Sequence, residues 1–185
     1  MPITANGAQL GIAEITVQPG TGVLYGVEGP DDGLNQPGNL WKINPQTGAA
    51  TLVGSTGKFF NTITFAPNGT LYLEAADLAM GPANPSLNVI DPNTGVILSS
   101  KSTADYFGAL AVRPTDNVLF ASTGDSAKLM TIDPANGAET PVGSTELNFV
   151  GALAFSPVPE PGALALLGLG LLATSVAVRR RPNRE

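Results

Sequence analysis

The chain has 185 residues, including 22 Gly and 16 Pro, with no Cys, no His and a formal net charge of −6. The absence of Cys excludes disulfides, iron–sulfur clusters and cysteine nucleophiles, and the absence of His excludes Ser-His-Asp triads and histidine metal ligands. Because the balance is acidic, the chain also lacks the basic surface of a nucleic-acid-binding protein. Hydrophobic residues make up 43% of the chain, enough for one folded domain with an appendage.

Residues 2–10 open the chain without the basic and then apolar pattern of a signal peptide. They align loosely with Pro141–Phe149, which ends the third of the repeated units described next. We therefore expect this segment to be the last strand of a repeat that is otherwise missing.

From residue 12 to residue 157 the sequence repeats, and two independent anchors mark the repeat. One anchor is a strand-like triplet, with large apolar residues two apart, followed by a proline; the other is Asn/Asp-Pro-x-x-Gly. Successive prolines are 48, 47 and 43 residues apart in the first anchor, and 47 and 42 apart in the second, which makes chance improbable. The triplets begin at Ile15, Ile63, Leu110 and Leu153, and the turns begin at Asn44, Asp91 and Asp133.

Each unit is predicted to hold four short antiparallel strands, because alternating apolar residues are separated by turn signals. The triplet is the first strand, and the Asn/Asp-Pro turn with its later Gly separates the third strand from the fourth. The second strands carry Leu24-Tyr25, Leu71-Tyr72 and Leu119-Phe120; the third are Leu40–Ile43, Leu87–Ile90 and Leu129–Ile132; the fourth are Thr51–Val53, Val96–Leu98 and Thr140–Val142.

Four antiparallel strands every 42–48 residues resemble the blades of a β-propeller, and the Asp-Pro-x-x-Gly ending is similar to that of NHL/YVTN-like and quinoprotein-like propellers. The resemblance implies an all-β domain over residues 1–157, with blades at about 12–60, 61–107 and 108–150 and the first strand of a fourth at 151–157.

Closed propellers have four or more blades, so three blades and partial strands are expected to belong to a larger or an assembled ring. The leading hypothesis is that the chain is the C-terminal part of a longer propeller protein. The alternatives are a ring built from two copies, or an open three-blade stack whose free strand edges favour self-association.

The loops between second and third strands are acidic and are predicted to emerge at one end of the blades, where they also carry Glu28 and Glu74. Carboxylates gathered there would suit Ca²⁺, but no D-x-D-x-D-G loop is present. We therefore predict solvated acidic loops, with no metal site and no cofactor. The weak candidates for metal ligands are Asp31, Asp32, Asp77 and Asp125.

Three further features are interpreted as structural. The Asn or Asp before each repeated proline is predicted to form the turn with its side chain rather than to join a carboxylate site. Trp41 alternates with core positions, which favours packing over a sugar-stacking surface. Asn68-Gly69-Thr70 fits a glycosylation sequon, but Asn-Gly is first of all a hairpin turn.

The charge changes sign near residue 158: residues 1–157 carry a net charge of −8, and residues 158–185 carry +2. Within the tail, residues 162–178 are uncharged, and a helix of this length would be roughly 25 Å long, at the short end of a membrane span. The cluster Arg179, Arg180, Arg181 favours the cytoplasmic side, which places residues 1–157 across the membrane. We predict one C-terminal transmembrane helix over about 162–178.

The tail over residues 158–185 resembles the PEP-CTERM sorting signal, because Val158 and the Pro-Glu-Pro motif, an apolar span and an arginine cluster follow in that order. The resemblance implies a substrate of an exosortase, an integral-membrane cysteine protease of Gram-negative bacteria that make exopolysaccharide. The enzyme would read Pro159, Glu160 and Pro161 and cut nearby, releasing or transferring the body. A plain membrane anchor is the alternative.

The leading interpretation is an exported, non-enzymatic binding or scaffold protein of the cell envelope or exopolysaccharide matrix. Its precursor is expected in the inner membrane with the body in the periplasm. The expected partners are the exosortase and the membrane, together with polysaccharide or other surface proteins. The alternatives are a Ca²⁺-dependent propeller hydrolase or lactonase, a quinoprotein-like oxidoreductase, and a non-functional remnant.

Overall fold

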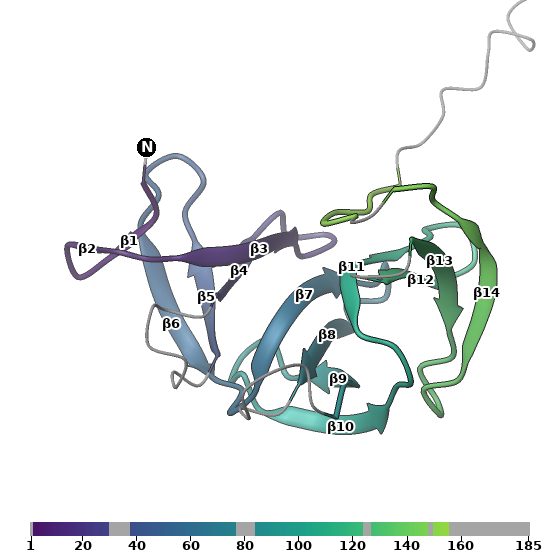
Figure 1. Cartoon of the computed structure of the whole chain (residues 1–185). Helices are drawn as coiled ribbons and strands as arrows, with labels where there is room; N and C mark the ends of the chain where they lie inside the picture. The colour runs from purple at the N-terminus through teal and green to yellow at the C-terminus, as the bar shows by residue number, and fades with distance from the viewer. Residues whose placement is uncertain (1, 30–37, 77–83, 124–126, 148–149, 156–185) are drawn as a thin grey trace, which may run out of the picture. The chain divides into compact units, whose positions relative to one another are not determined.

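The computed structural model describes residues 2–29, 38–76, 84–123, 127–147 and 150–155, and the chain divides into two units, residues 1–155 and 156–185. Within the described ranges all regular structure is β-strand (Figure 1). Three four-stranded antiparallel sheets account for most of it, and in each sheet the strands lie in chain order. The predicted all-β fold with four strands in each repeat is therefore confirmed.

The three sheets use equivalent segments of the three repeats. The predicted limits between repeats, after residues 60 and 107, fall inside the first strands of sheets 2 and 3. Sheet 1 consists of β3 (Ile12–Val17), β4 (Leu24–Glu28), β5 (Asn39–Ile43) and β6 (Ala50–Ser55); sheet 2 of β7 (Phe59–Phe65), β8 (Leu71–Ala76), β9 (Ser86–Ile90) and β10 (Ile97–Ser102); sheet 3 of β11 (Phe107–Val112), β12 (Leu119–Thr123), β13 (Lys128–Ile132) and β14 (Glu139–Ser144).

Each first strand carries a bulge at the same place in the repeat. A bulge leaves one residue outside the ladder and increases the local twist of the strand. The residue that follows it is Glu14 in β3, Thr62 in β7 and Ala109 in β11. The register shifts lie between Ile12 and Glu14, between Phe60 and Thr62, and between Phe107 and Ala109.

The repeated Asn/Asp-Pro turns join the third and fourth strands, and their first side chains cap them as predicted. The Oδ1 atom of Asp91 accepts a hydrogen bond from the backbone N–H of Asn93 at 2.9 Å, and Asp133 accepts one from Ala135 at the same distance. In the first repeat, Oδ1 of Asn44 accepts hydrogen bonds from the backbone N–H groups of Gln46 and Thr47. The closing glycines all have positive φ, between 68° and 80°, which a glycine adopts without strain: Gly48, Gly95 and Gly137.

Residues 2–10 form a hairpin, so the prediction of a single outer strand is wrong. β1 (Thr4–Ala5) and β2 (Ala8–Gln9) are joined by Asn6 and Gly7, whose φ angles of 51° and 82° are those of a tight two-residue turn. The N–H of Thr4 donates to the carbonyl oxygen of Gly48 at 2.9 Å. The hairpin therefore lies against the turn between β5 and β6.

Apolar side chains of alternate strand residues fill the spaces between elements. One buried cluster is shared by sheets 1 and 2, a second by sheets 2 and 3, and a third by sheet 1 and the hairpin. Their main members are Tyr25, Leu40, Ile63, Phe65 and Leu71 in the first; Leu87, Phe107, Leu110, Leu119 and Ile132 in the second; and Ala5, Trp41 and Ile43 in the third.

Side-chain hydrogen bonds join the first strands of neighbouring sheets, which lie side by side (Figure 1). The backbone N–H of Ile63 donates to Oε2 of Glu14 at 2.8 Å, and that of Leu110 donates to Oγ1 of Thr62 at 3.0 Å. Glu14 and Thr62 are equivalent residues, each directly after the bulge. The same position in sheet 3 is Ala109, which has no side-chain acceptor to offer.

Residues 150–155 are not a strand, so the predicted first strand of a fourth blade is absent over the described residues. They nevertheless lie on sheet 3, because the Oγ of Ser122 donates to the carbonyl of Val150 at 2.9 Å. The rings of Phe120 and Phe155 meet edge to face, with centroids 5.3 Å apart. The first strands of the three sheets each pair with a second strand of their own sheet, and the described residues hold no such partner for residues 150–155.

Candidate functional site

The residues with the most specific predicted roles lie outside the described residues. These are the sorting motif, the apolar span over 162–178, the arginine cluster and the weak metal-ligand candidates. By number they are Pro159, Glu160, Pro161, Arg179, Arg180 and Arg181, together with Asp31, Asp32, Asp77 and Asp125.

Across residues 2–29, 38–76, 84–123, 127–147 and 150–155, no group of three or more Asp, Glu, His or Cys is arranged to hold a metal ion. Over the same part of the chain, no helix is long and apolar enough to span a membrane.

The loop end of sheet 1 holds a small polar cluster. Glu28 ends β4, and its Oε2 accepts hydrogen bonds from Nδ2 of Asn39 at 2.8 Å and from Nε1 of Trp41 at 3.1 Å. The Trp41 side chain is 9% exposed and packs with Ala5 and Ile43, as its alternation with core positions predicted. Because its ring faces are covered, Trp41 offers no surface on which a sugar could stack.

Glu74 was predicted to start a solvated loop, and this is wrong. It lies within β8, is fully buried, and takes the repeat position of Val27 and Ser122. Neither carboxyl oxygen makes a hydrogen bond of good geometry. Burial raises the pKa of Glu74 from 4.5 to about 8, with the nearby backbone N–H of Phe107 opposing part of the rise, so the carboxyl is largely protonated at neutral pH.

An apolar cleft of about 250 Å³ lies over the face of sheet 3. The guanidinium carbon of Arg113 lies 5.0 Å from the centre of the Phe120 ring, which is a cation–π contact. The remaining walls are aliphatic or aromatic. The lining residues are Arg113, Phe120, Leu129, Leu153, Ala154 and Phe155.

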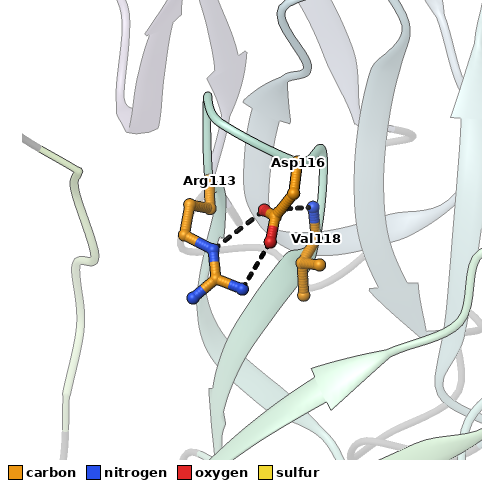
Figure 2. Close-up of polar contacts among 3 residues, drawn as sticks. All are labelled: Arg113, Asp116 and Val118. Atoms are coloured by element: carbon orange, nitrogen blue, oxygen red, sulfur yellow. Dashed lines mark hydrogen bonds and ion pairs between the residues drawn. The ribbon is translucent and has the colours of Figure 1, made fainter.

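The charge of Arg113 is matched by a neighbouring carboxylate (Figure 2). Nε and Nη2 of Arg113 donate to the two carboxylate oxygens of Asp116 at 2.8 and 2.6 Å, and the N–H of Val118 also donates to Asp116. These bonds lower the pKa of Asp116, so the carboxylate stays ionised. With its cation paired, the cleft is suited to packing against an apolar segment rather than to transferring a proton.

Sequence reasoning did not identify this cleft, because its walls come from β12, from β13, from the residue after β11 and from residues 153–155. Equivalent positions in the repeat do indicate its aromatic wall. Phe120 occupies the position of Tyr25 and Tyr72, and Phe155 occupies that of Phe65. The Tyr25 and Phe65 rings meet edge to face at 5.2 Å, and Phe120 and Phe155 reproduce this contact at 5.3 Å.

Comparisons with known proteins divide the chain at the same place as the structure. Residues 6–156 match the family model described as "Repeat of unknown function (DUF6923)", and residues 157–181 match the PEP-CTERM protein-sorting motif. No curated protein matches the chain.

Three solved structures are similar at a TM-score of 0.48. They are hydrazine synthase of Kuenenia stuttgartiensis (21% identity, 69% of this chain and 36% of that chain), a protein of unknown function from Bacteroides caccae (12%, 82% and 51%) and the WD40 repeats of RRP9 (13%, 76% and 40%). The chain thus spans about a third to a half of the length of each. The family match covers most of the chain, so the protein belongs to the family of repeats of unknown function DUF6923, and it carries a PEP-CTERM sorting motif at its C-terminal end.

Proposed function

We propose that the protein is delivered to the cell envelope or extracellular matrix by an exosortase, and that its repeat domain then binds or scaffolds without catalysing a reaction. The observation that carries the proposal is the PEP-CTERM motif over residues 157–181, directly after the repeat-family match over residues 6–156. A sorting signal in this position leaves the folded body on one side of the processing site.

The chemistry of the tail supports this order of events. Pro159 and Pro161 cannot continue a helix and push the preceding residues towards extended backbone, so the motif would be presented as an accessible peptide. The uncharged residues 162–178 would hold the precursor in the inner membrane, and the arginines that follow would keep the C-terminus on the cytoplasmic side.

The test is the intact mass and location of the full chain, expressed with and without an exosortase. We expect a loss of roughly the last 25 residues that requires the protease, because cleavage near the Pro-Glu-Pro motif removes the membrane span. Changing Glu160→Gln together with Pro161→Ala should block processing. The matched control is Pro157→Ala, a proline two residues before the Pro-Glu-Pro tripeptide, which should be processed normally. An uncleaved chain in the inner membrane would overturn the proposal.

The non-enzymatic part of the proposal has its own test. A Ca²⁺-dependent hydrolase or a quinoprotein-like enzyme would be stabilised by its ion or cofactor, because a ligand that binds only the folded state raises the melting temperature. We expect no rise in Tm when the protein is titrated with Ca²⁺ or with pyrroloquinoline quinone. A saturable rise of several degrees would instead favour the enzyme.

A further inference from the structure

The first strand of sheet 1 exposes residues that the other sheets bury. In β7 and β11 the large apolar residues of the triplet are 7% exposed or less, because each strand packs on the preceding sheet. Their equivalents in β3, Ile15 and Val17, are 50% and 54% exposed. Among the described residues the hairpin over 2–10 reaches Trp41 and Ile43 but leaves this part of β3 uncovered.

The opposite end of the array carries the matching half of the same interface. Between sheets 1 and 2, the residues that receive the first strand of the next sheet include Tyr25 and Leu40, which are almost fully buried. Phe120 and Leu129 occupy these positions in sheet 3. The chain therefore carries two complementary surfaces. They are the exposed side of β3 and the face of sheet 3 at Phe120 and Leu129, and together they are equivalent to the two surfaces that meet between sheets 1 and 2.

Residues 153–155 occupy the receiving face of sheet 3 only partially. Phe155 reproduces the ring contact of Phe65 but remains 40% exposed, and the segment is not paired into a strand. By contrast, Ile15 and Val17 belong to a strand that is hydrogen-bonded along its length to β4. A preformed strand loses less conformational entropy on docking than an irregular segment does.

We propose that β3 of a second copy of this chain docks on the Phe120–Leu129 face of sheet 3, taking the place of residues 153–155. The contact repeats the existing interface between sheets and joins two different surfaces, so it is heterologous and leads to a head-to-tail assembly. Because Ala109 supplies no acceptor, the new interface lacks the hydrogen bond that Glu14 and Thr62 make, and we expect it to be reversible. The proposal does not depend on sorting by an exosortase.

Cysteine crosslinking of the full chain in detergent tests the geometry, because the natural sequence has no cysteine. One tagged copy carries Ile15→Cys and a differently tagged copy carries Ala109→Cys. In the equivalent contact inside the chain, the backbone N of Leu110 lies 3.0 Å from Oγ1 of Thr62, which brings these two positions of neighbouring first strands close together, so we expect a mixed disulfide on mild oxidation. The matched control replaces Ile15→Cys with Leu98→Cys, on the equally apolar but unrelated surface of β10, where Leu98 is 64% exposed.

Two variants test whether β3 of a second copy and residues 153–155 compete for the same face of sheet 3. Self-association is measured by analytical ultracentrifugation of the full chain in density-matched detergent. Val17→Ser should weaken self-association about tenfold, since the burial of one valine is lost. Phe155→Ser should strengthen it, because the segment that occupies the receiving face is loosened. Both residues are substantially exposed, so neither change should prevent folding. Equal crosslinking in the control pair, or association unaffected by Val17→Ser, would overturn the proposal.

Discussion

The carboxylate of Glu14 accepts a hydrogen bond at 2.8 Å from the backbone N–H of Ile63, a residue 49 positions further along the chain. This contact joins the first strands of two sheets together with the bond from the N–H of Phe65 to Oγ1 of Thr16 at 3.2 Å, and Thr62 makes the equivalent contact with Leu110. The body is thus an array in which side chains on the first strand of one sheet accept hydrogen bonds from the first strand of the next. Stability in such an array is approximately a sum of terms from the sheets and from the interfaces between neighbours.

Replacing Glu14→Ala should destabilise the body by about 1–3 kcal/mol, because the buried N–H of Ile63 would be left without its acceptor. Glu14→Gln retains an oxygen at the same place and should cost clearly less. Urea unfolding followed by tryptophan fluorescence measures both, since Trp41 lies in sheet 1. Equal losses for the two variants would show that the contact contributes little.

Glu74 should make the fold less stable as the pH rises. Its pKa is about 8 in the folded chain against 4.5 for an exposed glutamate, so the folded state holds a proton that the unfolded state releases. The stabilisation is complete below pH of about 4.5 and is lost between that value and about 8. Burial also raises the pKa of Glu14, which acts in the same direction.

The check for Glu74 is the melting temperature of Glu74→Gln and of the natural protein between pH 5 and pH 9. We expect the natural protein to lose several degrees relative to the variant over this range, because the amide does not titrate. Parallel curves for the two proteins would mean that the carboxyl is not protonated in the folded state.

Gly54 marks a close approach between sheets 1 and 2. A Cβ atom there would overlap the carbonyl oxygen of Thr94, which belongs to the turn after β9. Gly54→Ala should therefore destabilise the fold by about 2 kcal/mol or more, as overpacking against backbone does. Gly143 is the equivalent residue of sheet 3 and has nothing within 4 Å, so Gly143→Ala should be nearly neutral. Thermal unfolding of the two variants compares them directly, and similar losses would contradict this account.

The ion pair in Figure 2 should matter far less than Glu14 does. Arg113 and Asp116 are both substantially exposed, and an exposed pair contributes little to stability even with good geometry. Asp116→Asn should lower the free energy of unfolding only slightly, and the difference should shrink in 1 M NaCl. A large loss that persists in high salt would indicate that Asp116 acts through the turn to Val118 instead.

The repeat predicted the strands well because each one depends on local signals, namely alternating apolar residues and a proline or glycine turn. The bulges after Ile12, Phe60 and Phe107 carry no such signal, since they depend on how neighbouring sheets meet. Glu74 was misplaced for the same reason: its charge indicated solvent, and only the packing of two sheets shows that it is buried. The Asn6-Gly7 dipeptide, by contrast, is typical of a hairpin turn, so the hairpin over residues 2–10 could be predicted from the sequence. The loose alignment of these residues with Pro141–Phe149 favoured a single strand instead.

The cleft over sheet 3 could not be predicted from composition, because it depends on how residues 153–155 lie on a face of that sheet. The cleft can be identified once equivalent strand residues of the three repeats have been aligned. Phe120 matches Tyr25, and Phe155 matches Phe65, so one ring contact in the middle of the chain predicts another near its end.

Residues 150–155 would be the first part of the body to detach if the chain were pulled from its C-terminal side. A pull applied to the chain at residue 156 acts first on residues 150–155, where Ser122 and Phe120 hold the segment and no first-strand acceptor does. These contacts would yield before the Thr62 and Glu14 hydrogen bonds carry any force. Residues 150–155 would thus become an extended segment, while the three sheets stay folded.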